Sequence, residues 1–68
     1  MNNLKMDSSL IEKFDIIYDS LINGQKKQAV FQMKELSPIE ISELLDYFHY
    51  DLTKPQLALE LSKAYINS

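Results

Sequence analysis

Asp46 and His49 are the side chains in this 68-residue chain that come closest to a metal site. On a helix, residues three apart lie on one side, and this pair resembles half of the carboxylate and histidine arrangement that holds iron in di-iron bundles. A complete site needs a second histidine, and the chain has only one. Asp46 also lies beside Glu43 on a polar edge, away from the apolar stripe of Leu44 and Phe48. We therefore expect His49 to be a surface histidine, with no metal and no cofactor.

Other catalytic patterns are also missing from the sequence. Cysteine is absent, which excludes disulfides and thiolate ligands, and one glycine cannot build a phosphate-binding loop. The serines lack the surroundings of a nucleophile elbow. Acidic residues are common, but acid–base catalysis needs a pocket that shifts their pKa values, and a chain of this length offers little volume for one. We predict that the protein is not an enzyme and has no catalytic residues.

Composition indicates one small folded domain. Apolar residues make up 46% of the chain, and ten acidic residues against seven lysines give a net charge of −3, with no arginine. Arginine supplies most bidentate contacts to bases and phosphates, so nucleic acid is an unlikely partner. Residues 1–6 contain no apolar run of the kind that a signal sequence carries, and no apolar run in the chain approaches the roughly 20 residues of a membrane span, so we expect neither feature. We expect a flexible N-terminus at 1–8, a single helical domain at 9–68 and a cytoplasmic location without membrane contact.

Apolar residues recur at helical spacing throughout, and no segment alternates with a period of two. Ser37, Pro38 and Glu40 form the clearest helix start, because serine and glutamate three apart cap each other's backbone N–H groups and proline suits the first helical position. The pairs Ser9–Glu12 and Thr53–Gln56 predict two further capping boxes, and Gly24 marks a helix end. The sequence thus predicts an all-α bundle of four short helices, at residues 9–23, 25–36, 38–50 and 54–67.

Large apolar side chains remain outside the predicted core stripes of these helices. They are Ile16, Phe31, Ile39, Tyr50, Leu59 and Ile66. Scattered exposed apolar residues are normal, so each one alone means little. If they lie near one another, they form a patch of the kind that marks a protein interface, and homodimerisation is then the simplest use. The alternatives are scatter or a misassigned core face.

Charged residues accompany these side chains on two helices. Lys27 and Lys34 flank Phe31 at helical spacing, which suits an acidic partner or, less well, a stacked nucleobase. Acidic residues follow one edge of the first and of the third predicted helix. These edges are Glu12, Asp15 and Asp19, and Glu40, Glu43 and Asp46. Such edges are usually solvated faces, and the alternatives are a docking surface for a basic partner or imitation of the negative charge of DNA.

Two functions fit these patterns. The first is a non-catalytic helical protein–protein interaction module, self-associating, that binds or modulates a larger partner. Its predicted interface residues are Phe31, Lys27, Lys34, Ile39, Tyr50, Leu59 and Ile66. The second is a small DNA-binding regulator of the helix-turn-helix type, because the last two helices are spaced loosely like that motif. With the last helix as the reading helix, only Lys54 and Lys63 would be positively charged, which is too few for useful affinity at physiological salt. With the second helix instead, Lys26, Lys27 and Lys34 would contribute, which makes that version the stronger competitor.

Overall fold

The computed structural model describes residues 8–68, and within this range the chain forms helices joined by turns, with no strand. The elements are α1 (Ser8–Ile22), α2 (Lys26–Met33), α3 (Pro38–Asp46), a π-helical segment η1 (Tyr47–Asp51) and α4 (Pro55–Ile66). The predicted small all-α bundle of four helices is confirmed. The predicted flexible N-terminus falls outside the described residues except for Ser8, which belongs to α1.

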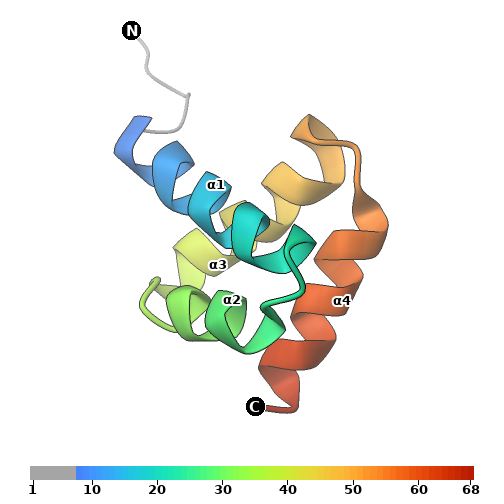
Figure 1. The fold of residues 1–68 in the computed structure, drawn as a ribbon. Helices are drawn as coiled ribbons and strands as arrows, with labels where there is room; N and C mark the ends of the chain where they lie inside the picture. The colour runs from blue at the N-terminus through green and yellow to red at the C-terminus, as the bar shows by residue number, and fades with distance from the viewer. Residues whose placement is uncertain (1–7) are drawn as a thin grey trace, which may run out of the picture.

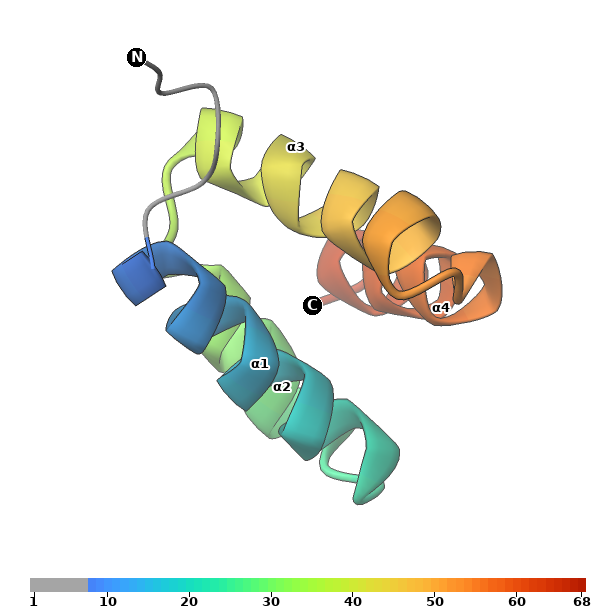
Figure 2. The ribbon, with the colours of Figure 1, turned by 90° about the horizontal axis from the view of Figure 1, so that it is seen from above.

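The helices are arranged as two pairs that cross each other. α1 and α2 lie side by side as an antiparallel hairpin (Figure 1). α3 continues into η1, and the chain then turns back into α4, which packs against both η1 and α2 (Figure 2). The start of α3 therefore lies at the opposite end of the molecule from α4.

The core is where the four helices meet. Its largest fully buried side chains are Phe14, Phe48, Ile17, Met33, Leu44 and Leu61. Each of these contributes about 1.5–3 kcal/mol when it is removed from water, which allows helices too short to be stable alone to fold together. Tyr47 closes one edge of this core. Its ring centroid lies 5.5 Å from that of Phe14 on α1, and its hydroxyl donates to Asp15 Oδ1 at 3.1 Å.

Two of the predicted helix ends are present as expected. The Ser37 hydroxyl accepts from the Glu40 N–H at 3.2 Å, and the Glu40 carboxylate accepts from the Ser37 N–H at 2.9 Å. Gly24, at φ +78°, ends α1. The N–H of Gln25 then donates to the carbonyl of Ser20 and the N–H of Gly24 to that of Leu21, which is the Schellman pattern.

The other two predicted capping boxes are wrong. α1 already includes Ser8, so Ser9 lies inside the helix and not at its cap. At the start of α4 the cap residue is Lys54, and no side chain caps the helix. Thr53 instead has φ +51°, and its hydroxyl donates to the carbonyl of Leu52. The cause is η1: the Lys54 N–H reaches back to the carbonyl of Phe48 at 2.8 Å, and this closure requires Thr53 to adopt a left-handed conformation.

The helix boundaries also differ from the prediction. α2 ends at Met33 and not at residue 36, because Glu35 and Leu36 donate to carbonyls three residues back, which tightens the chain into turns. α3 ends at Asp46 because the helix widens at η1, where the Leu52 N–H donates to the carbonyl of Tyr47, five residues back. π-Helical turns of this kind are often found at functional sites.

Candidate interaction surfaces

Phe31 lies in an open apolar hollow of about 530 Å³ between α2 and the end of α4. We call this hollow the basic groove. Its lining residues are Lys26, Lys27, Val30, Phe31, Lys34, Ala64, Asn67 and Ser68. The structure thus brings Phe31 together with Lys27 and Lys34, the group predicted from their spacing, and adds residues from α4.

The packing of α2 explains why the groove forms. Ala29, Val30 and Met33 are buried and fix α2 against the core. Phe31 then has to lie beside the buried face, and 61% of it is exposed. Ala64 on α4 is a small side chain opposite it, so space remains between the two helices. The groove surface is therefore mainly apolar, with three lysines among its lining residues.

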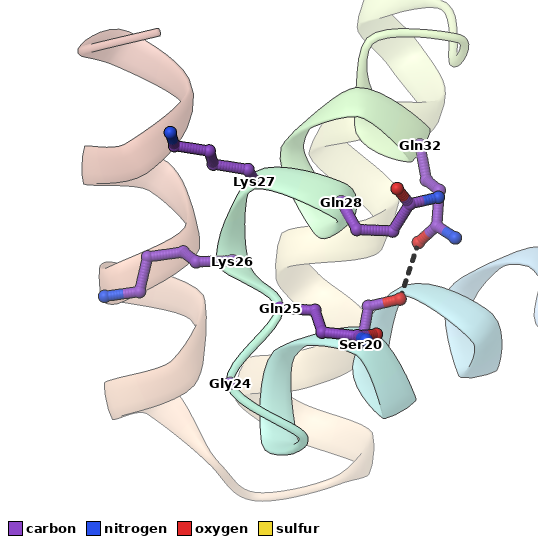
Figure 3. Close-up of a pocket in the computed structure, with 7 residues that line it drawn as sticks. All are labelled: Ser20, Gly24, Gln25, Lys26, Lys27, Gln28 and Gln32. Atoms are coloured by element: carbon purple, nitrogen blue, oxygen red, sulfur yellow. Dashed lines mark hydrogen bonds between the residues drawn. The ribbon is translucent and has the colours of Figure 1, made fainter.

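The two faces of α2 are chemically different (Figure 3). Lys26 and Lys27 point toward α4, whereas Gln28 and Gln32 lie on the side of α1. There the Ser20 hydroxyl donates to Gln32 Oε1 at 3.1 Å, and Ser20 is the only buried polar residue among residues 8–68. This uncharged hydrogen bond links α1 and α2, whereas the lysines lie on the other face of α2.

A second surface runs along the outer side of α3 and η1. We call it the acidic ridge, and it consists of Ile39, Glu43, Asp46 and Tyr50. All four are exposed, Ile39 to 74% and Tyr50 to 67%. They point away from the core because Leu44 and Phe48, on the opposite side of the same helix, are fully buried. The ring of His49 stacks on that of Tyr50 with centroids 4.4 Å apart, which adds aromatic surface at one end.

Leu59 and Ile66 form a third surface. Both are exposed and lie on α4, on the side opposite the buried Ala58 and Leu61. Ile66 directly precedes Asn67, which lines the basic groove, so this surface adjoins the groove at the end of α4. All six side chains predicted to lie off the core are exposed. Among the predicted interface residues, Phe31 lies on α2, Ile39 and Tyr50 lie along α3 and η1, and Leu59 and Ile66 lie along α4.

The sequence prediction missed or misplaced several residues at these surfaces. Ile22, at the end of α1, is more than half exposed, although it is not among the side chains predicted to lie off the core. Ala64 packs against the core and also lines the basic groove with Asn67 and Ser68, and none of the three is among the predicted interface residues. The contribution of these three residues to the groove depends on how α4 packs against α2, and the periodicity of either helix alone does not indicate that packing. A small residue on the inner face of a helix is the only signal that points to such a hollow.

Nothing in residues 8–68 provides a group of three or more His, Cys, Asp or Glu side chains able to hold a metal ion. Asp46 and His49 belong to the exposed outer side of α3 and η1, as predicted for surface residues. Burial, and then the hydrogen bond and charge of Asp15 and the charge of Asp51, raise the pKa of Tyr47. Tyr47 is engaged in the contact between α1 and η1 and does not line the basic groove.

Comparisons with known proteins give no family assignment. No family model, no curated protein and no solved structure matches the chain. Among the described helices, none has the length and apolar character needed to cross a membrane.

Proposed function

We propose that this protein is a non-catalytic protein–protein interaction module that self-associates and binds or modulates a larger partner in the cytoplasm. The observation that carries the proposal is the basic groove, where Phe31 is exposed beside lysines on an otherwise apolar floor. An aromatic side chain next to long, flexible cations is a typical anchor point at interfaces. The exposed Leu59 and Ile66 add apolar surface that association would cover.

The substitution Phe31→Asp tests the proposal. Phe31 is 61% exposed, so covering its ring in an interface stabilises the complex by about 1–2 kcal/mol, which is roughly 5- to 30-fold in Kd. Its loss should not unfold the protein, because the side chain is outside the core. We expect sedimentation velocity at micromolar concentration to show association for the wild type and weaker association for Phe31→Asp, with the circular dichroism spectrum unchanged.

Gln28→Asp is the matched control. It introduces the same charge on the same short helix, but Gln28 lies on the side of α1 and does not line the basic groove. It should associate like the wild type. A wild-type protein that sediments as a monomer at all accessible concentrations would refute self-association. Equal weakening by both substitutions would show that charge, and not the position of Phe31, caused the effect.

DNA binding remains the competing function, and a gel shift separates the two. The basic groove gathers three lysines, but the chain carries a net charge of −3 and no arginine. The salt-dependent affinity of DNA-binding proteins rises with the number of phosphates neutralised, and three lysines are few. We expect no shift of random duplex DNA at low salt. A clear shift that disappears with added salt would favour the DNA-binding regulator instead.

A further inference from the structure

We propose that the basic groove of one copy of this chain receives the acidic ridge of a second copy. This inference rests on the proposed function, because it specifies how the module self-associates. The groove and the ridge were identified independently, from α2 with α4 and from α3 with η1. Their chemistry is complementary in both charge and apolar character, and both surfaces belong to the same sequence.

Charge complementarity is the first argument. None of the eight residues that line the basic groove is acidic, and three of them are lysines. The groove is thus a local positive region on a chain of net charge −3. On the acidic ridge, Glu43 and Asp46 are exposed, and no described ion pair engages either of them. Opposite charges that face each other across an interface select the partner and speed its encounter.

The apolar parts also match. Ile39 and Tyr50 lie at the two ends of the ridge, and both are among the most exposed large apolar side chains of the described residues. Covering either of them requires a partner surface with its own apolar area, and the groove provides the exposed Phe31 and the partly exposed Ala64. A DNA duplex would repel the ridge, because its phosphates and the carboxylates of Glu43 and Asp46 are both negatively charged. The occupant that satisfies both surfaces is another copy of this chain.

The dimensions permit the contact. At 1.5 Å per residue, Lys27 and Lys34 lie about 10 Å apart along α2, and Glu43 and Asp46 lie about 5 Å apart along α3. Both carboxylates therefore fit within the span between the two lysines, and the flexible lysine side chains can reach them. The ridge is a single helical edge, a shape that an open groove between two helices can accept.

The contact is heterologous, since groove and ridge are made of different residues. One such contact leaves a free groove on one copy and a free ridge on the other. Assembly then continues into a ring or an open chain, unless the two copies can exchange both contacts and close as a dimer. The test therefore has to give the same answer for a closed and for an open assembly.

Charge reversal meets this requirement. The groove-reversed variant carries Lys27→Glu and Lys34→Glu, and the ridge-reversed variant carries Glu43→Lys and Asp46→Lys. Each variant alone opposes like charges, so we expect the Kd of self-association to rise on the order of 10-fold or more. In an equimolar mixture, every groove again meets a ridge of opposite charge. Sedimentation should show association restored in the mixture, in a closed or an open assembly.

A third variant controls for net charge alone. Lys13→Glu with Lys54→Glu changes the net charge as much as groove reversal does, but both residues lie outside the groove. This variant should associate like the wild type. If it weakens as much as the groove-reversed variant, or if the mixture of the two reversed variants stays monomeric, the proposed pairing of groove and ridge is wrong.

The outcomes separate this inference from the proposed function. A wild-type monomer overturns both self-association and the pairing. Wild-type association that both reversed variants retain overturns only the pairing and directs attention to Leu59 and Ile66. A fluorescent single-stranded oligonucleotide serves as the last probe. If the wild type binds it and the groove-reversed variant does not, while self-association is unaffected, the groove belongs to nucleic acid and the inference fails.

Discussion

Tyr47→Phe is the substitution for which the structure gives the sharpest expectation. It removes a single oxygen atom, the hydroxyl that donates to Asp15 Oδ1 at 3.1 Å and so links η1 to α1. The ring stays, with its centroid 5.5 Å from that of Phe14, so the packing of the core is conserved. Any change in stability then reports on the hydrogen bond and on the ionisation of Tyr47.

The magnitude follows from the surroundings of this bond. A hydrogen bond to a charged group contributes about 1.5–3 kcal/mol when it is shielded, but solvent reaches this pair, so we expect about 1 kcal/mol. For a domain of this size that corresponds to a melting temperature lower by about 4–8 °C. Urea unfolding followed by circular dichroism at pH 7 measures the difference directly.

The pH dependence gives a second, independent check. The pKa of Tyr47 is raised in the folded protein, first by burial and then by Asp15 and Asp51. The folded state therefore holds the phenol proton more tightly than the unfolded chain, whose tyrosine pKa is about 10. The contribution of Tyr47 is complete below this value and is lost as the pH rises through the folded pKa. The advantage of the wild type over Tyr47→Phe should be constant near neutral pH and shrink in alkali.

Two comparisons make the expectation refutable. Tyr50→Phe alters a largely exposed tyrosine on the same segment and should change stability by much less than Tyr47→Phe. Combined with Asp15→Ala, Tyr47→Phe should cost less than the sum of the two single changes, because both remove the same bond. An alkaline stability difference equal to that at pH 7, or strict additivity with Asp15→Ala, would show that the hydroxyl does not act through Asp15.

Two further predictions concern the helix ends, and urea unfolding tests each of them. Ser37→Ala removes the hydroxyl that accepts from the Glu40 N–H and should cost about 1 kcal/mol, whereas a value near zero would mean that water replaces the cap fully. Gly24→Ala should destabilise by about 1 kcal/mol through its positive φ alone, since no atom lies within 4 Å of the added Cβ, while Thr53→Gly should be neutral or stabilising. If Gly24→Ala and Thr53→Gly both lower the free energy of unfolding, the left-handed backbone conformation does not determine which residue is favoured at positions 24 and 53.

Local signals predicted the fold well because they agree over short distances. At Ser37 the cap, the proline and the glutamate all favour the same helix start, and the structure has it there. At Thr53 the same residue types predicted a cap that does not form. The difference arises after η1, where the Lys54 N–H donates to the carbonyl of Phe48. With this hydrogen bond formed, Thr53 has a left-handed backbone, which does not suit a capping residue. This hydrogen bond follows the π-helical segment at Tyr47–Asp51, and no residue type in that segment predicts a π-helical turn.

The candidate surfaces were predictable in part for the same reason. Phe31 with Lys27 and Lys34 follows from the spacing of one helix, and so does the outward direction of Ile39 and Tyr50. The contribution of Ala64 to the groove does not, because it depends on α4 packing against α2. The sequence therefore predicted the chemistry of each surface, and the structure was needed to show that α4 completes the basic groove.

The position of the lysines on α2 argues that the basic groove was not selected for stability. Lys26 and Lys27 occupy the first turn of α2, at the positive end of the helix dipole, with no acidic residue in that turn and no side-chain cap. Cations there cost about 0.3–1 kcal/mol each in a helix of only eight residues. A purely solvated face gains nothing from this arrangement, whereas a surface that binds carboxylates does. Lys27→Glu alone should therefore weaken association without lowering the melting temperature, and a lower melting temperature would show that Lys27 supports the fold instead.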